Sequence, residues 1–377
     1  MSTRRYDAIV AGVGTMGSAA LYHLARRGRR VLGLEQFGLA HDRGSMHGHT
    51  RIIRLAYHEH PDYVPLLRRS YELWHELEAA AGEPLIHVIG ALEIGPPGGF
   101  LLPGALHACE VHDLPHEVLE PAEVRRRFPA IVPAPNTIGL LQPDGGYVRA
   151  EESVRAHARL AVEAGAELRT DEPVLAWDAD DGGVTVRTPA GEYAASRLVL
   201  APGAWAPGLL RLPGPHFTIQ RNVLGWFEPV RPDHLTPDRL PIFIFEDDDG
   251  THHYGFPLLD DTGVKLGRMY YPGEIVDPAE GNPEATPEEA EPLREHLARS
   301  VPDAAGRLLD AKACLFTNVP DMDFVLDVHP EAHNVVFASA CSGHGFKFAP
   351  VVGEILADLA DEGSTRHSIG FLSHARF

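Results

Sequence analysis

The pattern of apolar and polar positions over residues 6–35 predicts a strand, a helix and a second strand. Residues 7–11 are short, apolar and partly β-branched, which is typical of a buried parallel strand. Residues 18–27 carry apolar side chains at helical spacing, and the glycine that follows them ends the helix. Residues 31–34 are again apolar and lead into Glu35. This order predicts a βαβ unit.

The first predicted strand is followed at once by the sequence GVGTMG, residues 12–17. In this position Gly12 permits a tight turn, Gly14 lets the backbone approach a pyrophosphate, and Gly17 lets the helix pack close to the strand. Glu35 can accept a hydrogen bond from a ribose hydroxyl, and its charge repels a 2′-phosphate. The motif therefore predicts a bound dinucleotide, NAD or FAD, and disfavours NADP. The alternative is a tight βαβ turn without a ligand.

Strand-rich segments are predicted to interrupt the nucleotide-binding part of the chain. Helices are predicted at residues 63–81, 119–128, 149–165, 288–301 and 351–359. Strands are predicted at residues 86–94, 139–141, 146–148, 174–177, 184–188, 191–193, 197–201, 219–228, 242–246, 252–257, 264–270 and 334–338. We expect an α/β fold in which a Rossmann-type domain is interleaved with a β-sheet-rich domain, the first formed by residues 1–85, 149–213 and 320–377 and the second by residues 86–148 and 214–319.

The bulk composition limits the class of protein. A chain of 377 residues and 41.1 kDa is expected to form two domains. No apolar run approaches the roughly twenty residues that a membrane span needs, and residues 1–5 lead straight into the first strand, so we expect neither a membrane segment nor a signal peptide. The net charge of −20 argues against nucleic acid and anionic membranes as partners. Three cysteines cannot build a disulfide framework, which favours a cytoplasmic protein.

Lysine is rare in this chain. The sequence carries 33 basic residues, yet its lysines are Lys265, Lys312 and Lys347 alone. Where arginine is the default cation, a lysine can mark a place that needs a compact ammonium with a tunable pKa. The alternative interpretation is that these are three ordinary surface lysines.

A polar segment after the βαβ unit holds the histidines His41, His47 and His49. Their spacing matches no zinc pattern, and no cysteine or acidic cluster joins them, so we expect no metal. Arg51 and Arg54 follow, three residues apart. If this stretch is helical or a tight turn, both guanidinium groups share one face.

Two later segments also place glycines beside a predicted strand. Residues 197–205 form an apolar strand that ends near Gly203, where the backbone can approach a cofactor closely. Residues 342–347, SGHGFK, lie between a strand and a helix. Gly343 and Gly345 let backbone N–H groups point at an anion or at an electron-rich ring edge, and Lys347 adds a positive charge. A plain strand-to-helix turn with a capping role is the alternative for the second segment.

These motifs together resemble a known family along essentially the whole chain. The landmarks are residues 12–17, 44–54 (GSMHGHTRIIR), 265–267 (KLG), 313–318 (ACLFTN) and 342–348. With them the chain is similar to the monomeric sarcosine oxidase and N-methyltryptophan oxidase family, FAD amine oxidases of the D-amino-acid-oxidase superfamily. The resemblance implies a glutathione-reductase-like FAD-binding domain and a β-sheet substrate domain that roofs the flavin.

The resemblance also implies roles for residues that match the family's motifs. Cys314 matches the cysteine that bonds covalently to the flavin 8α-methyl group, and a thiolate is the nucleophile that this bond needs. Arg54 and Lys347 match the pair that binds the substrate carboxylate, one as a bidentate fork and the other as a point charge. Lys265 matches the lysine credited with oxygen activation, because an ammonium stabilises the charge that forms when O2 is reduced. A buried small hydrophobic residue is the alternative for Cys314.

Further positions follow from the same resemblance. Arg51 and His47 match residues around the flavin face, and we assign them with Lys265 to catalysis. Tyr254 and Met269 are assigned to the substrate pocket with Arg54 and Lys347. The predicted cofactor contacts are Gly12, Gly14, Thr15, Met16, Gly17, Glu35, Ser45, Thr50, Val174, Gly203, Cys314, Gly343, Gly345 and Lys347.

The chain departs from the family's pattern in the substrate pocket. Met46 replaces a histidine, and His49 replaces an acid. Met269 stands where a histidine is expected, and Phe316 replaces a tyrosine, which removes a hydroxyl donor. Tyr254 is retained. The flavin machinery is therefore nearly whole, whereas the substrate side is altered.

The hypothesis that follows is an FAD-dependent oxidase of secondary amines or N-methyl amino acids. A neutral amine would give a hydride from its N-alkyl carbon to flavin N5, the imine would hydrolyse, and O2 would be reduced to hydrogen peroxide. The expected partners are a small amine or amino acid and O2, with a monomeric protein.

The sequence leaves several alternatives open. The same fold could serve an N-methyltryptophan oxidase, an oxidase of another cyclic or secondary amino acid, or an amine dehydrogenase with an acceptor other than O2. A catalytically silent flavin-binding protein is the alternative of another class. An NAD-dependent dehydrogenase is disfavoured because Cys314 and the 342–347 turn would have no task.

Overall fold

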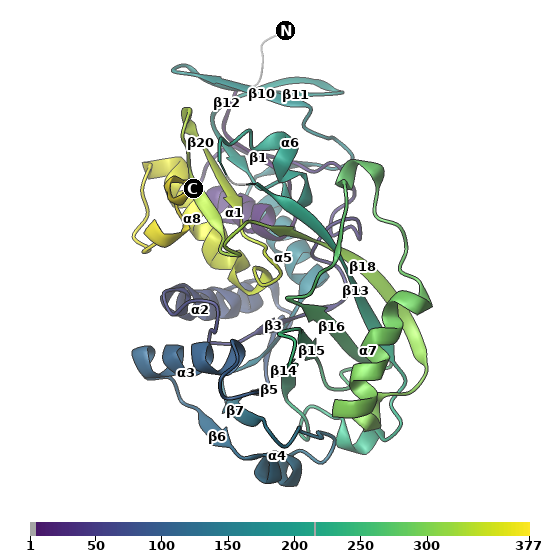
Figure 1. The fold of residues 1–377 in the computed structure, drawn as a ribbon. Helices are drawn as coiled ribbons and strands as arrows, with labels where there is room; N and C mark the ends of the chain where they lie inside the picture. Colours follow the sequence, from purple (N-terminus) through teal and green to yellow (C-terminus); the bar gives the residue numbers. More distant parts are fainter. Residues whose placement is uncertain (1–4, 215) are drawn as a thin grey trace.

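The computed structural model describes residues 5–214 and 216–377, and it arranges them around two large β-sheets that lie one above the other in Figure 1. The expectation that the chain starts without a targeting segment rests partly on residues 1–4, which lie outside the described residues. None of the described helices is long and apolar enough to cross a membrane.

The first sheet is built on the predicted βαβ unit, which is confirmed. Strand β1 (Arg5–Ala11) pairs in parallel with β2 (Val31–Leu34) and with β12 (Gly191–Leu200), and α1 (Thr15–Arg26) connects β1 to β2. The remaining strands of this sheet are β9 (Glu167–Arg169), β10 (Ala176–Asp180), β11 (Gly183–Thr188), β19 (Val325–His329) and β20 (Ala332–Ser339). The predicted meander is also confirmed, except that residues 191–193 and 197–201 belong to one long strand, β12.

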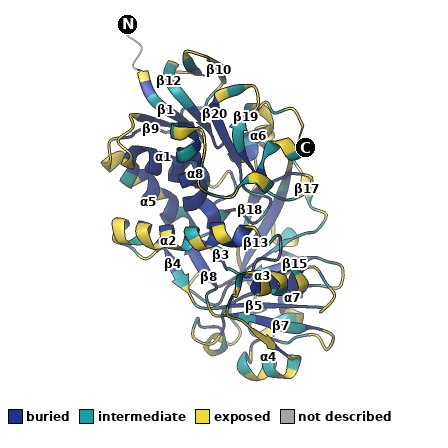
Figure 2. Cartoon of the chain, turned by 90° about the vertical axis from the view of Figure 1, so that its left-hand side faces the viewer, coloured by how far each residue is buried: buried dark blue, intermediate teal, exposed yellow. Residues whose placement is uncertain are grey.

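Helices cover one face of this sheet. Alternate residues of β1 explain why: Ala8 and Val10 face the helical core, whereas Ile9 and Ala11 face a second core on the other side. Helix α1 packs against α5 (Ala150–Glu163) and α8 (Ala349–Glu362), and Figure 2 shows α1 buried between its neighbours. Helix α2 (Tyr63–Ala81) has the bounds predicted for it and packs against α5 and α8.

The second sheet forms the lower part of the molecule in Figure 1. One face carries Ile244, Tyr254 and Met269 toward a cavity, and the other packs under α7 (Pro287–Ser300). The sheet consists of β5 (Ala91–Gly95), β6 (Glu117–Leu119), β7 (Ile138–Gln142), β13 (Thr218–Phe227), β14 (Ile242–Glu246), β15 (His252–Gly255), β16 (Val264–Met269), β17 (Glu274–Ile275) and β18 (Leu308–Asn318). Short helices α4 (Pro121–Arg127) and α6 (Ala206–Leu209) complete the fold.

A small sheet connects the two predicted parts of the chain, and it corrects two expectations. It joins β3 (Thr50–Ile53), β8 (Gly146–Arg149) and β4 (Ile86–Val88). Residues 86–94 are therefore not one strand: Gly90 has φ of 87°, and the chain passes from β4 to β5 in another sheet. Arg51 and Arg54 start from an extended segment, so the shared helical face suggested for them is wrong.

Helix α3 (Leu101–His112) was not predicted. Pro103 and Gly104 near its start are typical of a loop. The helix forms because the Glu246 carboxylate accepts hydrogen bonds from the backbone N–H groups of Phe100 (2.7 Å) and Leu101 (2.9 Å). A side chain from the second sheet thus satisfies donors that a local cap would satisfy elsewhere.

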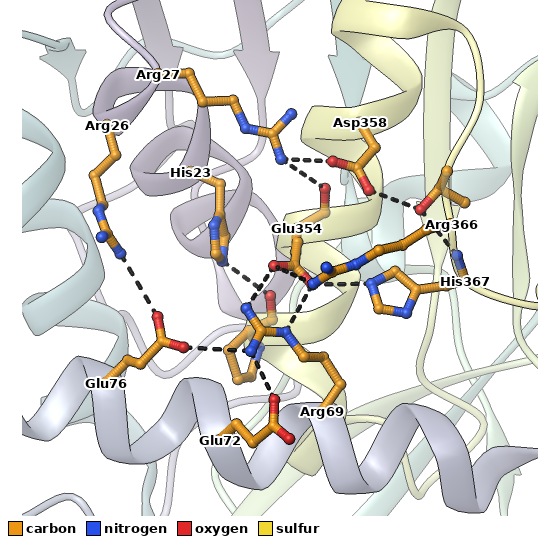
Figure 3. A network of polar contacts seen from close by, with 12 residues as sticks. His23, Arg26, Arg27, Arg69, Glu72, Glu76, Glu354, Asp358, Arg366 and His367 are labelled. Carbon is orange, nitrogen blue, oxygen red and sulfur yellow. Dashed lines mark hydrogen bonds and ion pairs between the residues drawn. The ribbon is translucent and has the colours of Figure 1, made fainter.

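A polar network fastens α8 to its surroundings (Figure 3). The Glu354 carboxylate accepts hydrogen bonds from Arg69 of α2 at 2.7 and 3.0 Å, and it lies 2.9 Å from His367 of the C-terminal segment. Arg27 at the end of α1 reaches Asp358 at 2.6 Å. The network holds the helix that follows the 342–348 turn in a fixed position.

Candidate active site

A cavity of about 430 Å³ lies between the two large sheets. It begins at the carboxyl ends of β1, β2 and β12 and continues to the inner face of the second sheet. Open α/β sheets bind ligands at this edge. Of the residues predicted for the site, those that line the cavity are Gly12, Gly14, Thr15, Met16, Glu35, Ser45, Arg51, Arg54, Val174, Gly203, Tyr254, Met269, Gly343, Gly345 and Lys347.

The glycine loop fits the adenosine and pyrophosphate end of FAD. A Cβ on Gly17 would lie 1.7 Å from the Gly12 carbonyl oxygen, so this glycine is required by close packing of α1 on β1. A Cβ on Gly14 would meet nothing nearer than the Met46 methyl at 3.5 Å. The space beside Gly14 is therefore open to a ligand at the N-terminus of α1, where backbone N–H groups favour a phosphate.

Glu35 is buried at the end of β2 and lines the cavity. Its Oε2 atom accepts a hydrogen bond from the Val13 N–H at 2.8 Å, and its Oε1 atom accepts one from the Phe37 N–H at 3.1 Å. These two bonds fix the carboxylate beside the glycine loop. The predicted role of Glu35 as an acceptor for ribose hydroxyls stays a prediction.

The 342–347 turn is shaped by its own backbone. Ser342 and Gly343 have φ angles of 41° and 79°, and a Cβ on Gly345 would lie 1.9 Å from the Ala340 carbonyl oxygen. The turn thus follows β20 tightly and leads through a 3-10 turn (Phe346–Phe348) into α8. It brings Lys347 to the cavity, where Nζ donates a hydrogen bond to the His344 carbonyl oxygen at 2.7 Å.

Arg54 is held at the substrate end of the cavity by two carboxylates. Its Nη2 atom lies 3.0 Å from Oε2 of Glu59, and its Nε atom lies 3.3 Å from Oε1 of Glu93. Nη2 also lies 2.8 Å from Nδ1 of His58, and Nη1 donates to the Ala56 carbonyl oxygen. The guanidinium is buried, so this paired arrangement avoids an isolated charge.

The cluster around Arg54 shifts the pKa values of its members. Burial lowers the pKa of Lys347 to about 7, and the nearby Arg54 acts in the same direction. Burial raises the pKa of Glu93 to about 7, in spite of the opposing effect of Arg54. Glu59 has its pKa lowered well below the usual range, because His58 and Arg54 outweigh the effect of burial. The cluster holds two cations and two acids and can change its charge near neutral pH.

Lys265 lies on β16, immediately behind the cavity wall. Its Nζ atom donates hydrogen bonds to the carbonyl oxygens of Gly48 and Thr50, each at 2.7 Å, and lies 4.7 Å from the centre of the Phe256 ring. Burial and the neighbouring Arg51 lower the pKa of Lys265 well below its ordinary value. These contacts hold an ammonium group that has no carboxylate partner among the described residues.

Arg51 and His47 form one unit at the edge of the cavity. The Arg51 Nη2 atom donates to the carbonyl oxygens of Ser45 (2.7 Å) and His47 (2.6 Å). Burial lowers the pKa of His47 to about 4, and the Arg51 charge adds to this effect. The His47 imidazole is therefore neutral at pH 7.

Two cysteines lie near the inner face of the second sheet, and they differ in access. Cys314 is completely buried among Leu224, Trp226 and Phe316. Burial raises the pKa of its thiol, against the opposing effects of Arg51 and Lys265. Cys341, which has no predicted role, lines the cavity directly.

Not every predicted site residue reaches the cavity. Among the described residues assigned to the site, those behind the lining are Gly17, His47, Thr50, Lys265 and Cys314. His58 and Glu59 line the cavity and contact Arg54, although they were not predicted for the site. Glu93, which was not predicted either, contacts Arg54 from behind the lining. The sequence does single out Glu93, because it is the one acidic residue in the otherwise apolar segment that forms β5. A lone acid in a buried strand indicates a polar partner.

The fold and the cavity together are those of a dinucleotide-binding protein in which a second sheet closes the far side of the cavity. Comparison with known proteins makes this specific. The family described as FAD dependent oxidoreductase (DAO) matches residues 7–359, and the chain belongs to this family.

Individual relatives cover nearly the whole chain. The monomeric sarcosine oxidase of Streptomyces avermitilis is 45% identical over 98% of this chain and 97% of its own length. The N-methyl-L-tryptophan oxidase of Citrobacter koseri is 36% identical over 94% of this chain and 95% of its own. A solved structure of NikD, an amino acid oxidase essential for nikkomycin biosynthesis, in its open form, matches with a TM-score of 0.87 and 28% identity, covering 98% of each chain. The cofactor is therefore FAD, and the prediction of a Rossmann-type α/β fold is confirmed.

Proposed function

We propose that the protein is an FAD-dependent oxidase of secondary amines, with N-methyl amino acids as the substrate class. The observation that carries the proposal is the buried pair Arg54 and Lys347 at the end of a cavity that begins at the glycine loop. Cations buried beside an apolar wall fit a ligand with one carboxylate and a short apolar body. The relatives, a sarcosine oxidase and an N-methyl-L-tryptophan oxidase, point to the same substrate class. FAD, when bound, would supply the two-electron acceptor for oxidation of the N-alkyl carbon. The imine product would hydrolyse, and O2 would reoxidise the cofactor and give hydrogen peroxide.

Arg54 and Lys347 bind and orient the substrate. A substrate carboxylate competes with Glu59 and Glu93 for the guanidinium donors of Arg54. Lys347 has no ion-pair partner within reach among the described residues, so its ammonium is the readier of the two to accept the new anion. Both cations favour the neutral form of a substrate amine held between them and the cofactor.

The wall opposite these cations sets the shape of the substrate. It is formed by Ile244, Tyr254, Met269 and Phe316 from the second sheet. These side chains exclude water and offer few hydrogen-bonding groups, which suits an N-alkyl group and a modest side chain.

Lys265 is proposed to stabilise the negative charge that develops on O2. The two carbonyl oxygens that accept its hydrogen bonds fix the ammonium in a dry environment, where a charge acts strongly. An anion that forms beside Lys265 raises the pKa of its amine and so favours the charged form as the charge on O2 develops.

The link to FAD is proposed to be covalent through Cys314. Cys314 lies on the inner face of the second sheet, and its thiol is close enough to Arg51 and Lys265 for both to favour the thiolate. Acid precipitation of the purified protein tests this, since a covalent flavin stays with the pellet. Cys314→Ser should release the flavin, whereas Cys341→Ser should retain it. Release from the second variant alone would assign the bond to Cys341.

Substrate turnover tests the proposed function. We expect sarcosine or another N-methyl amino acid to bleach the flavin anaerobically, and in air to give hydrogen peroxide and formaldehyde in equal amounts. Proline and other cyclic amino acids, together with the corresponding N-methyl amines that lack a carboxylate, form the comparison panel. Failure of every secondary amine to reduce the flavin would refute the proposal. Reduction without reaction with O2 would indicate a dehydrogenase.

A further inference from the structure

Two histidines and an aspartate converge on the face of the second sheet that points away from the cavity. Asp247 directly follows β14, His253 lies on β15, and His296 lies on α7. Because side chains alternate along a strand, His253 points away from the cavity when its neighbour Tyr254 lines it. Among the residues that the structure describes, this is the one group of three whose potential metal ligands lie together, with all ligand atoms within 4.8 Å of one another.

The two imidazoles are buried, and the Nδ1 atom of each faces the same carboxylate oxygen of Asp247. His296 is 0% exposed, and its Nε2 atom has no hydrogen-bond partner. His253 is 5% exposed. Buried polar atoms are nearly always hydrogen-bonded. Two stacked histidines that share one carboxylate oxygen, one of them with an unpartnered Nε2 atom, therefore need an explanation beyond packing.

The distances agree with a shared metal ion. Nδ1 of His253 lies 3.1 Å from Oδ2 of Asp247, and Nδ1 of His296 lies 3.4 Å from the same oxygen. Ligands bound at about 2.0–2.1 Å in a tetrahedral zinc site are separated by about 3.3 Å.

We propose that Asp247, His253 and His296 bind a divalent transition-metal ion of the zinc type, with water as the fourth ligand. The Asp247 side chain is 33% exposed, which leaves a route for the ion and a position for water. The imidazole rings are stacked with centres 3.8 Å apart and an angle of 14° between their planes. Binding would fan the rings apart, because each metal bond lies in the plane of its own ring.

The ion would join the β14–β15 turn to α7. Its role is structural, since the cavity lies on the opposite face of the sheet. It would also stiffen β15, whose other face presents Tyr254 to the substrate. The proposal does not depend on the substrate class.

Metal analysis of the FAD-loaded enzyme tests the proposal. The protein is stripped with a chelator, mixed with Zn²⁺, passed through a desalting column and analysed for metal and for flavin. We expect one equivalent of Zn²⁺ per chain and a rise in melting temperature with added Zn²⁺. Asp247→Asn and His296→Phe should each bind Zn²⁺ at least about tenfold more weakly, because each removes one of three protein ligands.

His157→Phe is the matched control. His157 is another buried histidine whose Nε2 atom has no partner, but it is not part of the three-residue group. This variant should bind Zn²⁺ as the wild type does, and the flavin spectrum of each variant reports whether it is folded. The proposal is overturned if the stripped wild type takes up no stoichiometric Zn²⁺, or if folded Asp247→Asn and His296→Phe bind as tightly as the wild type.

Discussion

Lys265 is the residue whose surroundings are most readily explained by a single chemical task. An ammonium buried between two carbonyl oxygens and an aromatic ring has lost its hydration, and it has gained no carboxylate counter-ion among the residues that the structure describes. That arrangement is unfavourable at rest and favourable once an anion forms nearby.

Replacing Lys265 by methionine separates the two half-reactions. Lys265→Met keeps the volume of the side chain and removes the charge. We expect flavin reoxidation by O2 to slow by at least about 100-fold, as when an electrostatic group that stabilises a developing charge is removed. Anaerobic flavin reduction should change far less. Stopped-flow absorbance measures both rates, and equal slowing of the two would contradict the role.

Glu93 makes the charge of the substrate site depend on pH. Its pKa is raised by burial to about 7, so Glu93 is neutral well below pH 7 and negative well above it. The negative form opposes a ligand carboxylate that approaches Arg54. Glu93→Gln should therefore bind a simple carboxylate inhibitor about tenfold more tightly than the wild type at pH 8, equivalent to about one pKa unit of interaction, and nearly equally at pH 6.

Flavin absorbance titrations at the two pH values measure this effect. Lys347→Met is the companion variant, because the pKa of Lys347 is about 7 and its loss of charge also weakens anion binding as the pH rises. In that variant the affinity should be low at both pH values. A Glu93→Gln affinity that equals the wild type at pH 8 would remove Glu93 from the carboxylate site.

The site shows which residues a sequence can reveal. Glycines with fixed roles, such as Gly12 and Gly17, and the Lys347 turn were predicted because they stand in motifs beside clear strands and helices. Glu93 was missed because it becomes a partner of Arg54 only once the fold brings β5 beside the segment that follows β3. Glu59 was missed although it lies only five residues after Arg54, because the loop that turns it back toward the guanidinium group has no recognisable pattern. The roles of Cys314 and Lys265 were assigned from the resemblance to the sarcosine oxidase family. In the structure both side chains lie behind the residues that line the cavity.

At the scale of elements, α8 depends on the carboxylate of Glu354. The helix directly follows the turn that contains Lys347. The side chains of Arg69, Arg366 and His367 surround the Glu354 carboxylate (Figure 3). The pKa of Glu354 is lowered below its ordinary value of 4.5, because His367 and Arg69 outweigh the effect of burial.

Glu354→Gln should destabilise the protein by about 2 kcal/mol at pH 7, in keeping with the loss of hydrogen bonds between charged groups. A lowered pKa means that this stabilisation is present above pH 4.5 and is lost as the pH falls through the folded-state pKa. The difference in melting temperature between the two proteins should therefore shrink below pH 4.5. Glu72→Gln is the control: its carboxylate also meets Arg69, but its side chain is 64% exposed, so we expect almost no change. A constant difference from pH 7 to pH 4 would contradict this account.

Predictions of elements succeeded where the signal was local. Helix α2 has a continuous amphipathic pattern and a glycine at its end, and its predicted bounds agree with the structure. Helix α3 was missed because its start is capped by Glu246 from β14, a contact that no local pattern contains. The sequence predicts one strand over β4 and β5 because both halves are apolar. The chain changes sheets at Gly90 because of contacts with strands that are distant in the sequence, and no local pattern shows these contacts.

At the scale of the whole molecule, one chain supplies both sides of the cavity. The lining comes from the first sheet, the second sheet and the turn before α8, so the site needs no residue from another subunit. We propose that the protein is a monomer. Light scattering coupled to gel filtration should give a mass near the 41.1 kDa of the chain, and full activity in that peak. Activity found only in a larger species would contradict the proposal.

The division into two domains remains a prediction. In the predicted division, each domain is made of segments that are far apart in the sequence. Strand β12 pairs with β20, and β5 pairs with β14, so each large sheet joins segments from distant parts of the chain. During translation the first sheet lacks β20 until residue 339 has left the ribosome, and the second lacks β18 until residue 318 has done so. In many proteins the N-terminal domain folds before the next domain is synthesised. Neither large sheet of this protein can be completed in that way. The nascent protein therefore carries unpaired apolar strands for most of its synthesis, and we expect its yield to depend on chaperones that shield them.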